Sequence, residues 1–290
     1  MLKTIRLTEK FHNEKDGCVM LLGGFDGLHL GHKRLVKRAK EFDLSIGIMT
    51  IAQGKGAHSL FTFEERESIF QNAGIDFVFE LPFAEIKDLS PKAFATLLQS
   101  EFSPKVFICG DDFRFGKNAA GGAETLKHAT QVCVECVKLV TMEGEKISSS
   151  FIKECLKSGD VEKANLALGE EFFLMGEVFK DRGIGKALGF PTANILYPKE
   201  KFPLKLGVYE TRVEIDGKEY RCITNYGARP TFEDHNVLTE TYIDGFSGDL
   251  YGKRLTVRFV RFLRENQKFE SIDALKGQLE KDIGRVRKHD

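Results

Sequence analysis

The chain is predicted to fold as an α/β domain followed by a β-rich domain that ends in a helix. In its first half, short apolar runs alternate with polar, helix-like stretches, whereas runs of β-branched and aromatic residues separated by Gly, Pro and Asp fill the second half. The length of 290 residues fits two domains of about 150 residues each. We place the boundary near residues 168–172, with a first domain over residues 1–169 and a second over residues 170–290.

The first half follows the order strand, helix, strand, helix, which implies a parallel sheet with crossover helices. In such a doubly wound domain, ligands bind beyond the carboxyl ends of the strands, so the turns after Leu22, Ile51 and Cys109 are the places to look for chemistry. The expected strands cover residues 18–25, 44–51, 76–83 and 105–110, and the expected helices cover residues 32–42, 62–74 and 90–102.

Two short helices are expected over residues 147–169, because serines precede an apolar run of helical period and a glycine follows it. Closely spaced strands with turn signals then indicate an antiparallel barrel or sandwich. These strands are expected at residues 172–179, 207–215, 218–227, 237–246 and 255–263. Four apolar residues at helical spacing predict a final amphipathic helix over residues 271–288: Ile272, Leu275, Leu279 and Ile283.

The composition excludes several classes of protein. The 43 basic and 43 acidic side chains cancel, which removes the broad positive field of a protein that holds nucleic acid through its phosphates. No apolar stretch approaches the roughly 20 residues that cross a bilayer, and the charged N-terminus lacks a secretory pattern. We therefore expect a cytoplasmic protein with no nucleic-acid or membrane partner, and the sequence assigns no oligomeric state.

The six scattered cysteines are too few for a disulfide scaffold. Cys133 and Cys136 lack a second Cys or His pair that would complete a zinc site. In a strand these two thiols would point to opposite faces. We interpret them as small buried hydrophobic side chains.

The turn after Leu22 carries two imidazoles, His29 and His32, at the start of the following helix. Together with helix N–H groups, these imidazoles could hydrogen-bond the nonbridging oxygens of a phosphate under attack, which suits nucleotidyl transfer at an α-phosphate. Residues 29–32 match the HxGH signature of the nucleotidyltransferase superfamily. The alternative is a pair of histidines that only cap or pack the helix.

Two further segments of the first domain could bind nucleotide. Residues 110–117 follow a strand and place Asp112 where a nucleotide or flavin pocket could form. This segment is not a Walker A loop, because five residues rather than four separate Gly110 from the Gly-Lys pair at 116–117. Ser148 and Ser149 precede a helix that carries Lys153, so hydroxyls, N–H groups and a cation could converge on phosphate. A plain helix cap is the alternative.

The second domain carries its own candidates. Gly183, Gly185 and Gly189 surround Lys186 in a loop that could wrap a polyphosphate, and Thr192 and Asn194 offer hard oxygen ligands for magnesium. A structural loop is the alternative. On an expected strand, Glu240 could orient or deprotonate a hydroxyl in phosphoryl transfer, or it could be an ordinary solvated side chain.

Taken together, these motifs resemble the bacterial bifunctional riboflavin kinase and FAD synthetase family over nearly the whole chain. The matching segments in the first domain are GFDGLHLGH, DFRFG and ISSS, and those in the second are GFPTAN, GVYE, NYGARPTF, ETYIDGFSGDLYGK and RENQKF. The resemblance implies a Rossmann-like nucleotidyltransferase domain followed by a β-barrel riboflavin kinase domain. It further implies phosphorylation of riboflavin by ATP to give FMN, then adenylylation of FMN by a second ATP to give FAD and pyrophosphate.

The resemblance also implies roles for individual residues. Glu240 would be the kinase base, Thr192 and Asn194 would bind magnesium and ATP phosphates, and His29 and His32 would stabilise adenylyl transfer. Flavin would contact Asp112, Asn225 and Arg264. The remaining nucleotide-binding residues would be Gly24, Phe25, Asp26, Gly31, Ser148, Ser149, Lys153, Gly183, Gly185 and Lys186.

The chain departs from the family pattern mainly in its first domain. The usual Phe-x-Pro-His-Pro segment is absent, and His58 would have to replace its histidine from a glycine-rich loop. Gly24 stands where Asn or Thr is common. Lys153 and Lys186 stand where arginine is common, and lysine lacks the bidentate fork of arginine for phosphate. Two alternatives to the bifunctional enzyme therefore stay open: a kinase with weak or lost adenylyl transfer, and a non-catalytic flavin sensor.

Overall fold

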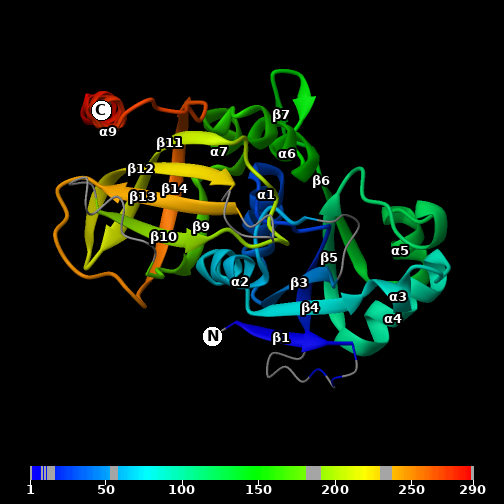
Figure 1. Ribbon diagram of the computed structural model, residues 1–290. Helices are drawn as coiled ribbons and strands as arrows, with labels where there is room; N and C mark the ends of the chain where they lie inside the picture. The colour runs from blue at the N-terminus through cyan, green and yellow to red at the C-terminus, as the bar shows by residue number, and fades with distance from the viewer. Residues whose placement is uncertain are drawn as a thin grey trace. The chain divides into compact units, whose positions relative to one another are not determined.

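The structure is a computed structural model that describes residues 2–7, 9, 11, 17–52, 58–180, 191–228 and 237–288. Its internal contacts divide the chain into two compact units, Met1–Ser149 and Ser150–Asp290. The first unit contains a parallel sheet with helices and the second an antiparallel sheet (Figure 1). Within the described residues, no helix is long and apolar enough to span a membrane.

The sheet of the first unit has six strands, all parallel, in the order β1-β4-β3-β2-β5-β6. This confirms the predicted doubly wound α/β fold. The direction of winding reverses between β2 and β5, so a ligand is expected in the crevice beyond their carboxyl ends. The strands are β1 (Lys3–Arg6), β2 (Cys18–Leu22), β3 (Ser45–Ala52), β4 (Phe77–Pro82), β5 (Pro104–Gly110) and β6 (Cys133–Val137).

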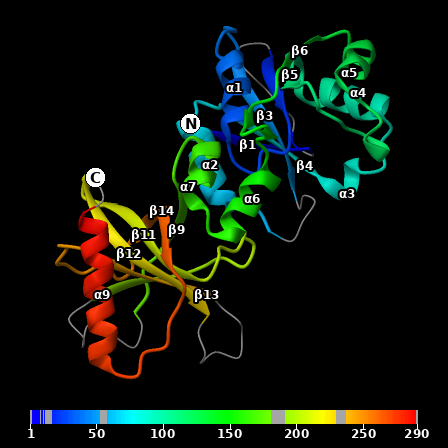
Figure 2. The same cartoon turned by 90° about the horizontal axis from the view of Figure 1, so that it is seen from above.

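Helices cover both faces of this sheet. Figures 1 and 2 show α4 and α5 together on one side and α1 on the other. Local signals start the helices: Thr62 and Glu65 form a capping box before α2, and Ser90 caps α4. The helices are α1 (Leu30–Ala39), α2 (Phe63–Asn72), α3 (Phe83–Ile86), α4 (Pro91–Phe102), the 3₁₀ helix η1 (Lys117–Ala119) and α5 (Ala123–Thr130), followed by the hairpin β7 (Thr141–Met142) and β8 (Glu145–Lys146).

The second unit contains a six-stranded antiparallel sheet in the order β10-β13-β12-β11-β14-β9. The sheet curls until its two edges meet, where the Phe179 N–H donates to the Asn194 carbonyl oxygen at 3.0 Å. The expected antiparallel barrel is therefore confirmed as a curled, partly closed one. The strands are β9 (Phe172–Glu177), β10 (Thr192–Leu196), β11 (Gly207–Ile215), β12 (Lys218–Ala228), β13 (Val237–Ile243) and β14 (Arg254–Arg264).

The two faces of the antiparallel sheet differ. On one face, buried hydroxyls form a ladder across three strands, from Thr211 to Thr224 at 2.7 Å and from Thr224 to Thr241 at 2.9 Å. The predicted C-terminal helix is confirmed as α9 (Ile272–Arg287), and it packs on the other face (Figure 2). There Ile283 and Val286 contact Val208 and Ile223. Side-chain alternation along each strand therefore places the threonine ladder on one face of the sheet and the contacts with α9 on the other.

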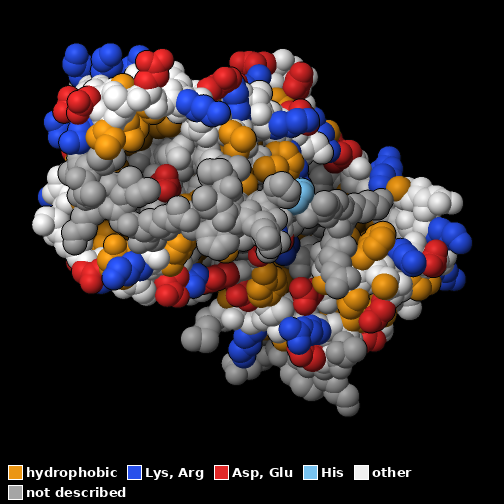
Figure 3. All heavy atoms as spheres, in the orientation of Figure 1, with side chains coloured by type: hydrophobic (Ala, Val, Ile, Leu, Met, Phe, Trp, Pro, Cys, Tyr) orange, Lys and Arg blue, Asp and Glu red, His pale blue; other side chains and the backbone are white. Residues whose placement is uncertain are grey.

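The two helices expected over residues 147–169 are α6 (Ser149–Ser158) and α7 (Val161–Leu168). Both lie almost entirely in the second compact unit, because α7 packs against β9 and β14. The division between the units therefore precedes these helices, whereas the expected domain boundary follows them. Basic and acidic side chains are interspersed over the visible face (Figure 3), as a net charge of zero leads one to expect.

The expected burial of Cys133 and Cys136 is wrong. Both residues are exposed, because β6 is the edge strand of the parallel sheet. The three-residue spacing nevertheless places them on opposite faces of a strand, as expected.

Candidate active sites

The first candidate site lies between β2 and α1. His29 is the N-cap of α1, and its ring stacks on the ring of His32 with centroids 3.7 Å apart. The Phe25 ring lies 4.4 Å from the His32 ring, on a backbone with φ 41°. A buried phenylalanine in this strained conformation indicates that the loop geometry is fixed by its surroundings.

Hydrogen bonds at Nδ1 give the two neutral rings different tautomers. His29 Nδ1 accepts the backbone N–H of His32 at 3.3 Å, so the proton of a neutral His29 lies on Nε2. His32 Nδ1 lies 2.9 Å from the Gly27 carbonyl oxygen, which only accepts, so the proton of a neutral His32 lies on Nδ1. His29 can therefore donate to a phosphate oxygen as a neutral ring, whereas His32 needs a second proton to do so.

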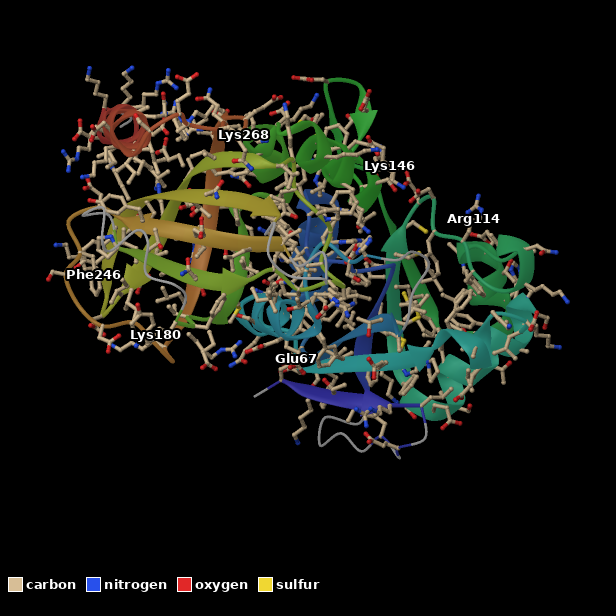
Figure 4. All side chains as sticks on the ribbon, in the orientation of Figure 1. Glu67, Arg114, Lys146, Lys180, Phe246 and Lys268 are labelled. Carbon is tan, nitrogen blue, oxygen red and sulfur yellow. The ribbon has the colours of Figure 1, made fainter. Side chains whose placement is uncertain are left out.

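Burial, assisted by the nearby charge of Lys146, lowers the pKa of His29 to about 4. Burial and then the adjacent His29 lower the pKa of His32 well below its usual range. Lys146 itself donates to the Asp112 carboxylate, and Figure 4 marks it on the β7–β8 hairpin. The sequence analysis missed Lys146, because it belongs to none of the motifs and only the fold brings it near the imidazoles.

The predicted nucleotide-binding residues near His29 and His32 differ in what surrounds them. A side chain at Gly31 would place its Cβ 3.0 Å from His29 Cε1, so glycine leaves room for the imidazole. Asp26 accepts the Leu60 N–H at 2.9 Å and so ties the loop to the segment before α2. Gly24 faces open space, so a larger side chain would fit there. His58 is exposed, and the preceding residues 53–57 lie outside the described part of the chain.

A cavity of about 650 Å³ opens at the carboxyl ends of β2, β3 and β5. The predicted flavin residue Asp112 pairs with Lys146, while the residues after it turn into the cavity. Glycine backbone and apolar side chains dominate the lining, which suits a flat aromatic ring system. The lining includes Gly23, Gly24, Ile51, Phe94, Phe113 and Phe115.

The serine segment lies at the junction of the two compact units. Ser148 precedes α6, and Ser149 is its first residue. Lys153 lies on α6 in the second unit, where its Nζ is 5.7 Å from the centre of the Phe202 ring.

The second candidate site is a row of side chains across the antiparallel sheet. Glu240 on β13 pairs in register with Asn194 on β10 and with Asn225 on β12. Registered neighbours point to the same face, and Asn225 Nδ2 donates to Glu240 Oε2 at 3.3 Å. The row continues through Val208 to Arg264. Four residues predicted from separate motifs thus lie side by side.

Asn194 leaves an acceptor without a partner. Its side chain is buried, yet its Oδ1 atom has no hydrogen-bond partner among the described residues. Thr192 lies two residues earlier on β10, on the same face. Since a buried amide oxygen is costly to leave unpaired, this pair fits a hard cation or a phosphate-bound ion. Gly183, Gly185 and Lys186 lie outside the described residues.

The Arg264 side chain forms an ion pair with helix α9. It donates to the buried Asp282 carboxylate through Nε at 2.9 Å and Nη2 at 2.8 Å, and Gln278 donates to the other carboxylate oxygen. Its position therefore anchors α9 beside the row.

A cavity of about 480 Å³ adjoins Thr192. Its other side is the loop after β13, which includes Phe246 (Figure 4) and Tyr251. The sequence analysis matched this loop to the family motif but assigned no site residue to it.

Comparisons with known proteins decide the family. The FAD synthetase family model matches residues 11–151, and the riboflavin kinase model matches residues 168–289. The bifunctional riboflavin kinase/FMN adenylyltransferase of Bacillus subtilis (strain 168) is 31% identical over 303 residues, covering 97% of this chain and 96% of that protein. The chain belongs to the bifunctional riboflavin kinase/FMN adenylyltransferase family.

Other comparisons extend over the same length. The bifunctional riboflavin kinase/FMN adenylyltransferase of Pseudomonas fluorescens is 32% identical and covers 98% of this chain and 97% of that protein. A crystal structure of a protein described as a macrolide-efflux protein from Streptococcus pneumoniae has 28% identity and a TM-score of 0.89, with 99% of each chain covered. The fold of both units thus recurs in an experimental structure.

Family membership confirms the predicted function. The chain phosphorylates riboflavin to FMN with ATP and adenylylates FMN to FAD with ATP. The presence of both domains favours this bifunctional enzyme over the kinase-only and sensor alternatives.

Proposed function

We propose that riboflavin phosphorylation occurs at the row around Glu240 and that adenylyl transfer occurs at the His29–His32 pair. The observation that carries the first assignment is the register of Asn194, Glu240 and Asn225 on three adjacent strands. The second rests on the two stacked imidazoles at the N-terminus of α1.

In the kinase step, Glu240 takes the proton of the ribityl 5′-hydroxyl as the oxygen attacks the γ-phosphorus of ATP and ADP leaves. Asn225 holds one carboxylate oxygen of Glu240 in place through its amide N–H. Because Glu240 sits on the central part of an ordered strand, its carboxylate approaches the substrate from a fixed direction.

Magnesium fits the second unit through the Thr192 hydroxyl and Asn194 Oδ1, which has no hydrogen-bond partner among the residues that the structure describes. Among the described residues no group of three His, Cys, Asp or Glu side chains could hold a metal, so ATP phosphates would complete the coordination. Bound Mg²⁺ would neutralise charge on those phosphates.

In the adenylyl-transfer step, an FMN phosphate oxygen attacks the α-phosphorus of ATP and pyrophosphate leaves. His29 donates its Nε2 proton to a nonbridging oxygen, and the backbone N–H groups at the start of α1 face the same developing charge. His32 contributes once it gains a proton at Nε2. The phosphates of bound ATP favour that protonation, because a nearby negative charge raises the pKa of an imidazole.

A pair of variants tests the two assignments independently. Glu240→Gln should lower FMN formation from riboflavin by about 10²–10⁴-fold, the usual contribution of a general base, and should leave FAD formation from supplied FMN unchanged. His29→Ala should do the reverse. Chromatographic product analysis with each flavin as substrate measures both rates.

Two exposed residues provide matched controls. Glu214→Gln on β11 and His128→Ala on α5 change the same side-chain types away from both sites. Each control should keep both rates. Unchanged FMN formation in Glu240→Gln, or equal loss of both activities in either site variant, would contradict the assignment.

A further inference from the structure

Two cysteines from different parts of the chain are direct neighbours in the parallel sheet of the first unit. Cys109 near the end of β5 pairs in register with Cys136 on β6. Neighbouring strands lie about 4.8 Å apart, and registered residues point to the same face. A disulfide needs Cα atoms about 4.4–6.8 Å apart, so this pairing brings the two thiols within bonding reach.

Among the described residues of the first unit, no other cysteine lies beside Cys109 or Cys136. All six cysteines belong to the described residues. Cys133 pairs with Val106 and, three residues from Cys136, points to the opposite face of β6. Cys18 lies at the far end of β2 from Leu22, the residue of that strand that neighbours Cys109.

The two thiols differ in exposure. Cys136 is exposed on an edge strand, whereas Cys109 is fully buried in the apolar core. Burial, with a smaller effect from contact with the Cys136 thiol, raises the pKa of Cys109 to about 12. Cys136 is therefore the thiol that an oxidant dissolved in water reaches first. The high pKa keeps Cys109 protonated, so its part in a bond rests on its register with Cys136.

We propose that Cys109 and Cys136 form a reversible disulfide when a hydroperoxide oxidises the protein. The Cys136 sulfur attacks the peroxide, an S–O bond forms as the O–O bond breaks, and the thiol proton leaves with the departing oxygen as water or an alcohol. The Cys109 sulfur then attacks the sulfenic acid. The S–S bond forms as the S–O bond breaks, and the Cys109 proton and the hydroxyl group leave as water.

The position of this pair connects it to the adenylyl-transfer site. Cys109 directly precedes the turn that carries Phe113 and Phe115 into the cavity at the sheet edge. The bond would fix β6 to β5 at the start of that turn.

Mass spectrometry of the full chain tests the modification without relying on activity. The protein is treated with hydrogen peroxide, unfolded in guanidinium with iodoacetamide, and digested. We expect a peptide linking Cys109 to Cys136 and the loss of two of the six alkylatable thiols, both reversed by dithiothreitol. A Cys109 that stays fully alkylated after treatment overturns the proposal.

Three variants sharpen this result. Cys136→Ser and Cys109→Ala should each abolish the linked peptide, and Cys136 is a surface position that tolerates the change. Cys133→Ser on the same strand should retain the linked peptide. A link that persists in Cys136→Ser, or that disappears in Cys133→Ser, contradicts the pairing.

A second measurement tests the effect on catalysis, and it rests on the proposed assignment of adenylyl transfer to the first unit. Peroxide should lower FAD formation from FMN in the wild type and in Cys133→Ser but not in Cys136→Ser, and dithiothreitol should restore it. Equal rates of FAD formation with and without the Cys109–Cys136 bond would overturn the proposed effect on catalysis. The linked peptide would still test the bond itself.

Discussion

The two candidate sites of this chain, which we propose to hold ATP phosphates, are built from different backbone elements. In the first unit, the polar groups lie on a turn that connects the end of a parallel strand to a helix N-terminus. Nδ1 of each imidazole forms a hydrogen bond with a backbone group. In the second unit, strand register aligns the groups on a sheet face, and Asn194 Oδ1 has no hydrogen-bond partner within the described part of the chain. The imidazoles of the first site therefore have their backbone hydrogen bonds without substrate, whereas the second site offers an acceptor that an ion or ligand could use.

Removal of that oxygen should have the largest effect. Asn194→Ala is expected to lower kcat/KM for riboflavin phosphorylation on the order of 10³-fold, because the γ-phosphoryl group and its cation both lose their position. FAD formation from FMN should be unchanged. Product formation measured against magnesium concentration checks this.

A conservative variant distinguishes ligand loss from damage to the strand. Asn194→Asp keeps a hard oxygen and should retain magnesium-dependent activity. Leu196→Ala, an exposed change on the same strand, should have little effect on either rate. If Asn194→Ala retains normal magnesium dependence, the second site does not depend on this oxygen.

The next largest effect concerns α9, the helix that Arg264 anchors beside the row around Glu240. Asp282 is fully buried and holds Arg264, so Asp282→Asn should destabilise the second unit by about 3 kcal/mol, the typical cost of breaking a buried pair. The exposed Arg287, which pairs with the half-buried Asp244, offers a control, since Arg287→Gln should reduce stability far less than Asp282→Asn. Denaturant unfolding of both variants measures the difference, and equal costs would contradict it.

Much of this arrangement could be predicted from sequence. The alternation of apolar and polar runs gave the parallel domain, and the HxGH turn placed His29 and His32 correctly at a helix start. Strand β10 was missed: Thr192 and Asn194 follow a glycine-rich loop and were treated as loop residues, although tertiary pairing with β13 makes them a strand. Short strands whose stability comes from pairing give little local signal.

Other features depend on long-range contacts. The sequence analysis considered Cys136 only beside Cys133, its neighbour in the chain, and placed the two thiols on opposite faces of a strand. The spatial neighbour of Cys136 is Cys109, far away in sequence. Lys146 and Arg264 have the same character: their partners Asp112 and Asp282 lie on other elements. The periodicity of the sequence does not predict such long-range pairs, because they depend on the order of strands in the sheet and on where α9 packs.

The preset geometry of the first site predicts sensitivity to one methyl group. In Gly31→Ala the new Cβ would meet the His29 ring at 3.0 Å and displace it. A shift of this kind should lower FAD formation by roughly 10- to 100-fold, while FMN formation in the same variant serves as the internal control. Steady-state rates with each flavin measure both. A Gly31→Ala protein with normal FAD formation would show that the position of the ring is not required.

The smallest expected effect is the pH dependence that burial of His29 imposes on stability. Because the pKa of His29 is lowered to about 4 in the folded chain, the unfolded chain binds more protons between about pH 4 and pH 6.5. The free energy of unfolding is thus unaffected by this protonation above pH 6.5. It falls as the pH drops toward 4, by about 1.4 kcal/mol at pH 5.5. His29→Gln should flatten this slope in denaturant unfolding, whereas His128→Gln on the exposed face of α5 should keep it. Identical slopes in the two variants would mean that His29 is not buried as a neutral imidazole. The conclusion that the first site is formed before substrate binds would then be wrong.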